Sequence, residues 1–170
     1  HDVLAVGSAA AGAHQIVPID RCPILTPAMH GFIEAAWAIA EVLKPAGKPL
    51  DIQATAANEG LDVDIRGSGP LRPAQSTALA HIAAEHKLAR ITRHGEMIVQ
   101  AVAPTIAIGR VQVALPPGAF LQPTEAGEIA LAALATEAVG GARSIADLFC
   151  GIGPLALRLA ERARILAADA

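Results

Sequence analysis

The sequence predicts an α+β domain over residues 1–115, followed by the beginning of a doubly wound α/β domain over residues 116–170. Strand and helix patterns are mixed up to about residue 115, which is typical of an α+β domain. A passage rich in Pro and Gly, LPPGAFLQPTE at 115–125, then marks a boundary. Beyond it the patterns read helix, strand, glycine turn, helix, strand, which is the order found in a parallel sheet with crossover helices.

The composition is that of a globular chain. Of the 170 residues, 53% are hydrophobic and 17% charged, and the net charge is −3. This excludes a disordered chain and gives no basic excess that would by itself indicate nucleic-acid binding. The only cysteines are Cys22 and Cys150, so no disulfide framework is indicated and we expect a reducing compartment, the cytoplasm. No apolar run reaches the roughly 18 residues of a membrane span.

In the first domain, apolar side chains recur at helical spacing in two segments and alternate in the others. Two hairpins are indicated by the turn sequences ANEG and RHGE. The arginines on or near these hairpins are expected to be solvated surface charges: Arg66, Arg72, Arg90, Arg93 and Arg110. The predicted elements are strands at 1–6 and 14–20, a helix over 27–44, a hairpin over 49–67, a helix over 72–87, a hairpin over 88–102 and further β structure over 105–118.

In the second domain the pattern predicts a helix over 123–139, a strand over 144–149, a glycine turn at 150–153, a helix over 154–163 and a strand over 164–169. This supplies two strands of a parallel sheet, which cannot cover its own faces. The chain also starts at His1 rather than Met. We therefore expect it to be an internal fragment of a longer protein with an incomplete sheet.

The glycine turn suits a nucleotide-like ligand. Gly151 and Gly153 let the backbone approach a ligand closely, and Pro154 fits the first position of a helix. Asp169 ends the next strand, where a carboxylate can accept hydrogen bonds from ribose hydroxyls. A purely structural role for the glycines stays open, because any strand–turn–helix connection favours glycine.

Two cofactor classes compete for this turn. The spacing Gly151-x-Gly153-x-x-Ala156 with Asp169 also satisfies the dinucleotide fingerprint of proteins that bind NAD or FAD. Asp147, however, lies just before the glycines, where its carboxylate would repel a pyrophosphate. An acid there favours a cofactor with an amine or cationic group and no phosphate, such as S-adenosylmethionine.

The stretch DLFCGIG, residues 147–153, resembles the cofactor motif of the RNA uracil-5-methyltransferases, whose usual form is D-L-F/Y-C-G-x-G. Phe120, Gln122 and the helix after them resemble the F-x-Q-x-N segment of that family, with Thr124 where the family usually has Asn. Residues 14–27, HQIVPIDRCPILTP, are similar to the segment that carries the last cysteine ligand of an iron–sulfur cluster in cluster-bearing members.

The resemblance implies roles for particular residues. Gln122, Asp147, Gly151 and Gly153 match cofactor-pocket positions, and Asp169 matches the ribose-binding acid, usually Glu. Cys22 matches a cluster ligand whose companions lie upstream in the family. One thiolate cannot hold a four-cysteine cluster, so we expect no cluster in this chain, and the resemblance implies one only for the full-length protein. The alternative for Cys22 is a small buried hydrophobic side chain.

The resemblance also implies an activity: S-adenosylmethionine-dependent methylation of carbon five of a uridine in rRNA or tRNA. In the family the nucleophilic cysteine and the general-base Glu lie further along the chain, so no catalytic residue is expected in these 170 residues and the fragment is expected to be inactive. Cys150 is then a pocket-lining residue and not a nucleophile. The alternatives are a fragment of an NAD- or FAD-dependent oxidoreductase and a non-enzymatic binding module.

Overall fold

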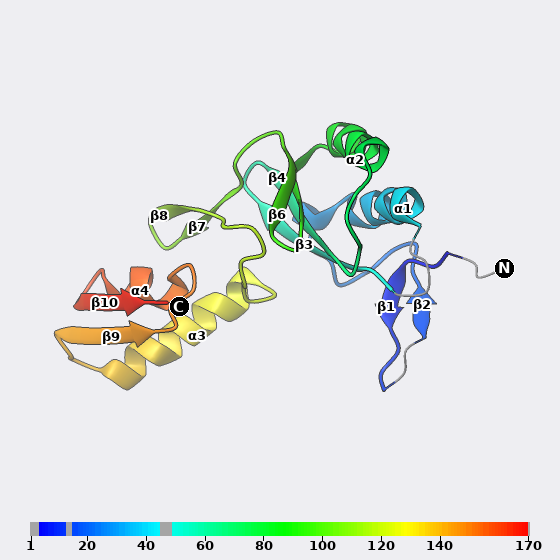
Figure 1. Ribbon diagram of the computed structural model, residues 1–170. Coiled ribbons are helices and arrows are strands. Elements are labelled where there is room, and N and C mark those ends of the chain that lie inside the picture. The colour runs from blue at the N-terminus through cyan, green and yellow to red at the C-terminus, as the bar shows by residue number, and fades with distance from the viewer. Residues whose placement is uncertain (1–3, 13–14, 45–48, 170) are drawn as a thin grey trace. The chain divides into compact units, whose positions relative to one another are not determined.

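The computed structural model describes residues 4–12, 15–44 and 49–169. The chain divides into two compact units, residues 1–104 and residues 105–170 (Figure 1). The sequence placed the domain boundary at 115/116 instead. The difference is a short hairpin after Pro104, which falls in the second unit because its first strand contacts a helix of that unit. Each unit is described below by itself.

A four-stranded sheet forms the centre of the first unit. Its order is β3-β4-β5-β6, with β4 and β5 parallel and the outer pairs antiparallel. Both predicted hairpins form, and His94 and Gly95 in the second turn have positive φ angles of 51° and 79°, as a tight hairpin turn requires. A helix, α2, connects the two parallel strands. The elements are β3 Asp51–Ala57, β4 Gly60–Arg66, α2 Pro73–Glu85, β5 Leu88–Arg93 and β6 Glu96–Gln100.

Helix α1, Phe32–Leu43, and helix α2 pack on this sheet and enclose its core. The alternating side chains of the strands supply one half of the core and one stripe of each helix supplies the other. The predicted helix over 27–44 is wrong at its start, because a 3-10 turn at Pro27–Met29 precedes it and Gly31 has a φ of +83°, which no α-helical residue adopts. The buried core contains Ala35, Ile39, Leu61, Val63, Ile65, Leu79, Ile82, Leu88 and Ile91.

A two-stranded antiparallel ribbon precedes helix α1. It consists of β1, Gly7–Ala9, and β2, Ile16–Pro18. The predicted strand at 1–6 is wrong for residues 4–6, and residues 1–3 and 14 of the two predicted strands lie outside the described residues. The partner backbone lies very close to Gly7, where a Cβ would clash with the carbonyl oxygen of Val17, so only glycine fits at this position.

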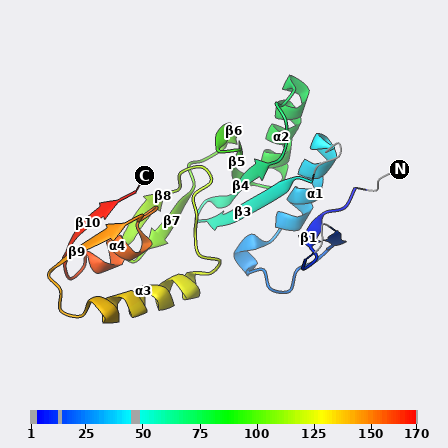
Figure 2. The same ribbon diagram turned by 60° about the horizontal axis from the view of Figure 1, so that its bottom comes forward.

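The second unit combines a hairpin, two helices and a parallel strand pair (Figure 2). Strands β9 and β10 pair in parallel, as predicted. Thr124 caps α3, since its Oγ1 accepts a hydrogen bond of 3.0 Å from the amide of Gly127. The helix predicted over 154–163 ends at Leu159, before the chain enters β10. The elements are β7 Thr105–Ile108, β8 Val111–Ala114, α3 Glu125–Val139, β9 Ser144–Leu148, α4 Pro154–Leu159 and β10 Arg164–Ala168.

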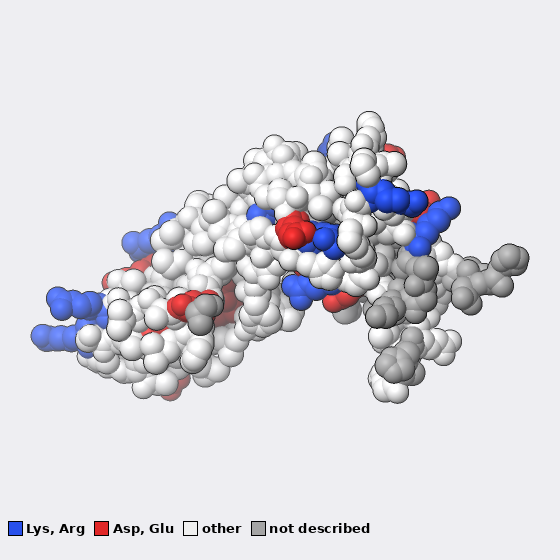
Figure 3. Space-filling view, viewed as in Figure 1, with Lys and Arg blue, Asp and Glu red and all other residues white. Residues whose placement is uncertain are grey.

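The second unit exposes apolar side chains. Leu148 and Leu166 are mostly exposed on the strand pair, and Leu131 and Leu134 are exposed on α3. On the face that Figure 3 shows, Lys and Arg side chains lie among Asp and Glu side chains, and most of the surface carries neither charge. No helix in the described part of the chain is both long and apolar enough to cross a membrane.

Candidate cofactor site

The glycine turn lies at the carboxyl ends of the two parallel strands. The amides of Phe149 and Cys150 both donate to the carbonyl oxygen of Ala168, at 2.8 and 3.1 Å. Ala168 is the last residue of β10, so the beginning of the turn is bonded to the residue directly before Asp169. Ligands of open α/β sheets bind at this edge. The structure therefore places the turn and Asp169 at the edge where the sequence predicted a cofactor.

The surroundings of the two glycines in the turn differ. Both adopt positive φ angles, +55° at Gly151 and +87° at Gly153, a region that L side chains rarely adopt. A Cβ on Gly153 would lie 3.4 Å from Cγ of Leu157, because this glycine is packed against the start of α4. A Cβ on Gly151 would meet no atom within 4 Å. Gly153 thus closes the turn onto the helix, whereas Gly151 borders open space.

Asp147 contributes a buried oxygen at the base of this turn. It lies on β9 opposite Ala167 of β10 and is half-buried. Its Oδ2 is buried and finds no hydrogen-bond partner among the described residues. A buried carboxylate oxygen without a donor is costly, so such groups call for an explanation. The atom fits the donor set that an amine-bearing cofactor would supply.

Phe149, which the sequence did not indicate as a site residue, has an unusual backbone conformation within the turn. In the sequence it lies two residues after Asp147 and two before Gly151. Its φ is +67°, and the residue is 83% exposed. A non-glycine residue in this conformation costs about 1 kcal/mol, and such strain clusters at functional sites. An aromatic residue inside a glycine turn was the sequence signal that could have indicated it.

The remaining predicted residues are more scattered. Asp169 is exposed after the end of β10, and Gln122 is exposed on the loop before α3. Helix α3 contacts α4, the helix that follows the glycine turn. The structure thus brings Asp147, Gly151 and Asp169 to one sheet edge, while Gln122 lies outside it on the loop before α3.

Neither cysteine lies in a ligand cluster. Cys150 is half-buried and its Sγ donates weakly to the carbonyl oxygen of Gly151, 3.6 Å away. Cys22 is half-buried in a turn in which its carbonyl accepts from the amide of Leu25, at 3.4 Å. Within the described residues no three His, Cys, Asp or Glu side chains gather as a metal site would require. The described residues therefore do not supply the companions that an iron–sulfur cluster needs beside Cys22.

Relatives with curated names identify the family. An uncharacterized RNA methyltransferase of Brucella melitensis is 37% identical over 157 residues, which are 92% of this chain and 38% of the relative. One of Caulobacter vibrioides is 38% identical over 160 residues, with 91% and 38% covered. The 23S rRNA (uracil(1939)-C(5))-methyltransferase of Pseudomonas fluorescens is 33% identical over 171 residues, with 95% and 36% covered. No protein-family model matches the chain.

A solved structure shows the same fold. The tRNA (uracil-54, C5)-methyltransferase of Pyrococcus abyssi, in complex with S-adenosyl-L-homocysteine, superimposes with a TM-score of 0.62 at 18% identity, over 91% of this chain and 43% of that one. The chain has a partial methyltransferase-like fold and belongs to the uracil-C5 RNA methyltransferase family. It spans about two fifths of the length of the curated relatives it matches.

Proposed function

We propose that this chain forms part of an S-adenosylmethionine-dependent RNA methyltransferase that methylates carbon five of a uridine in rRNA or tRNA. The observation that supports this cofactor is the buried Oδ2 of Asp147, which has no hydrogen-bond partner within the described part of the chain and lies at the base of a glycine turn whose Gly151 borders open space. The name of the Pseudomonas relative and the cofactor product bound to the Pyrococcus structure support the reaction.

In this proposal, residues in and near the glycine turn bind and orient the cofactor. Asp147 accepts a hydrogen bond from its amine, Asp169 accepts from its ribose hydroxyls, and Gly151 leaves room for it against the backbone. Gly153 and Gln122 complete the cofactor set. When bound, S-adenosylmethionine supplies a methyl group on a positively charged sulfur. The unpaired acid favours that group over the pyrophosphate of NAD or FAD, which it would repel.

No catalytic residue is assigned to these 170 residues. A cysteine nucleophile is commonly activated by a neighbouring base, and among the described residues the only hydrogen-bond partner of the Cys150 Sγ is the adjacent carbonyl of Gly151. We infer that the nucleophile and the general base lie elsewhere in the whole protein, that the 170 residues alone are inactive, and that Cys22 is a cluster ligand in the cytoplasmic full-length enzyme.

Calorimetry on the whole protein tests the cofactor. We expect S-adenosyl-L-homocysteine to bind the wild type, and NAD and FAD not to bind. Asp147→Asn should weaken binding roughly tenfold or more, because it removes the charged acceptor. Glu125→Gln is the matched control, since it also removes one carboxylate but from an exposed position in the first turn of α3. Binding of NAD instead would replace the proposal with the oxidoreductase alternative, and binding of neither cofactor would favour the non-enzymatic module.

An assay of methyl transfer to RNA tests the proposed reaction. The whole protein, given labelled cofactor and rRNA or tRNA transcripts, should place label on carbon five of a uridine. Cys150→Ala should retain this activity, and the isolated 170 residues should have none. Loss of activity in Cys150→Ala with unchanged cofactor binding would make Cys150 the nucleophile and overturn this part of the proposal.

A further inference from the structure

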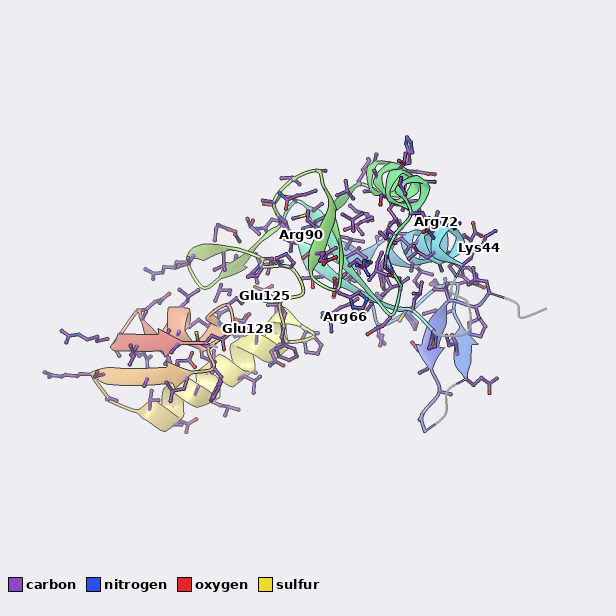
Figure 4. The ribbon with its side chains drawn as sticks, viewed as in Figure 1. Lys44, Arg66, Arg72, Arg90, Glu125 and Glu128 are labelled. Atoms are coloured by element: carbon purple, nitrogen blue, oxygen red, sulfur yellow. The ribbon has the colours of Figure 1, made fainter. Side chains whose placement is uncertain are left out.

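An ion pair ties the two helices of the second unit together. Nε and Nη2 of Arg158 on α4 both lie 2.8 Å from Oε1 of Glu128 on α3. Glu128 is labelled in Figure 4. The Glu128 and Arg158 side chains are only 12% and 22% exposed. An exposed ion pair contributes little, but a largely desolvated pair with two charge-assisted hydrogen bonds fixes geometry more strongly.

The ion pair lies close to the segments that carry the predicted cofactor residues. Glu128 is the fourth residue of α3 and Arg158 the fifth of α4. Each therefore lies about one helical turn after the start of its helix. The loop that carries Gln122 leads into α3, and the glycine turn leads into α4. On α3 the ion pair thus lies near the end that follows the Gln122 loop, whereas on the six-residue α4 it lies in the last turn, one helical turn away from the glycine turn.

Helix α4 is held in place by contacts with other elements, among them this ion pair and the burial of Ala156 and Leu159. It has six residues, and a helix of that length is not stable by its own hydrogen bonds. The stem of Arg158 is also packed on a second side, since a Cβ on Gly109 in the β7–β8 turn would lie 3.7 Å from Cγ of Arg158. Because α4 starts directly after Gly153, any rotation of α4 would move the glycine turn.

We propose that the Glu128–Arg158 ion pair is a positioning contact of the cofactor site, which holds the glycine turn at a fixed place relative to the Gln122 segment. This rests on the proposed function, namely that the turn binds S-adenosylmethionine. Neither side chain touches the cofactor in this proposal. They act through the helices, so their loss should affect cofactor affinity and leave the methyl-transfer step intact once cofactor is saturating.

The test uses the whole protein and S-adenosyl-L-homocysteine as the probe. Glu128→Gln and Arg158→Met should each raise its Kd roughly three- to tenfold, and the double variant should raise it no further than either single one, because both remove the same contact. Arg158→Lys, which keeps the charge, should lie between wild type and Arg158→Met. KM for S-adenosylmethionine should rise in parallel, with kcat unchanged.

Two control variants match these changes. Glu125→Gln removes a carboxylate from the same first turn of α3. Arg110→Gln breaks a weaker, exposed pair, in which Arg110 Nε lies 3.8 Å from Oε1 of Glu161. Both should change Kd by less than about twofold. Measurements are made well below the melting temperature of each variant, so that loss of folded protein does not mimic weaker binding.

The outcomes separate the two proposals. If the wild type does not bind S-adenosyl-L-homocysteine, the proposed function fails and the positioning role fails with it. If the wild type binds, but Glu128→Gln and Arg158→Met bind equally well with lowered melting temperatures, the pair only stabilises the fold and the positioning role is overturned. Strictly additive effects in the double variant would overturn it as well.

Discussion

Asp62 on β4 and Arg90 on β5 lie opposite each other on neighbouring parallel strands and form a nearly buried ion pair. Nε and Nη2 of Arg90 donate to the two carboxylate oxygens of Asp62 at 2.8 and 2.6 Å. The Asp62 and Arg90 side chains are 10% and 4% exposed. The sequence predicted Arg90 to be a solvated surface charge, which is wrong, because its partner comes from a strand 28 residues away in the chain.

Breaking this pair should destabilise the first unit strongly. Arg90→Met leaves the Asp62 carboxylate buried without a partner, which should lower the free energy of unfolding by about 3 kcal/mol. Urea unfolding followed by the fluorescence of Trp37 checks this, since Trp37 is the only tryptophan of the chain and lies on α1. The double variant Asp62→Leu/Arg90→Met should recover most of the loss, and the exposed Arg110→Met should cost less than about 0.5 kcal/mol. An unchanged midpoint for Arg90→Met would contradict the prediction.

Asp64, on the same strand as Asp62, is surrounded by donors. Burial alone would raise the pKa of its carboxyl, but hydrogen bonds from Arg66, Thr92 and the amide of Gly95 outweigh burial and hold the pKa below its ordinary value of 3.8. A carboxyl with a lowered pKa in the folded state stabilises the protein above its unfolded-state pKa. That stabilisation is lost as the pH falls through the folded-state pKa.

Asp64→Asn should therefore remove a pH-dependent part of the stability. At pH 7 we expect the free energy of unfolding to fall by about 1–3 kcal/mol, since the amide cannot accept from all three donors. The difference between wild type and variant should shrink as the pH falls below 3.8, because Asp64 of the unfolded wild type is then protonated, and it should shrink further as the pH approaches the lower folded-state pKa. Trp37 fluorescence during urea unfolding at pH 7 and at pH 3 checks this, with the exposed Asp51→Asn as control. A difference that is constant between the two pH values would refute it.

The sequence predicted the hairpins, helix α2 and the parallel pair β9–β10, because alternation, helical spacing and turn residues are local signals. It missed features that depend on contacts between distant segments. The helix predicted over 154–163 ends at Leu159 although its sequence could continue, because Arg164 pairs back to the carbonyl of Arg143 at 3.0 Å and starts a strand. The glycine turn was predictable from its residues. The unpaired oxygen of Asp147 and the positive φ of Phe149 were not, since both depend on the folded backbone.

The two glycines of the turn should respond differently to the same change. Gly153→Ala adds a methyl group against Leu157 at a φ of +87°, so it should lower stability by about 1–3 kcal/mol. Gly151→Ala adds one toward open space at a φ of +55° and should cost only about 1 kcal/mol. In the whole protein, however, Gly151→Ala should weaken binding of S-adenosyl-L-homocysteine more than tenfold, because it fills space used by the ligand. Thermal unfolding and calorimetry on both variants check this; equal losses of affinity at equal stability would contradict it.

Asp147→Asn should stabilise the chain while it weakens cofactor binding. No donor in the described ranges of the chain reaches the buried Oδ2 of Asp147, and a neutral amide costs less to bury than a charge. We expect the β9–β10 amides to exchange hydrogen more slowly, corresponding to a gain of about 1 kcal/mol. The exposed Asp169→Asn is the control and should leave exchange unchanged. Faster exchange in Asp147→Asn would mean that the carboxylate stabilises the empty site, and Asp147 would then be a structural residue rather than one reserved for a ligand.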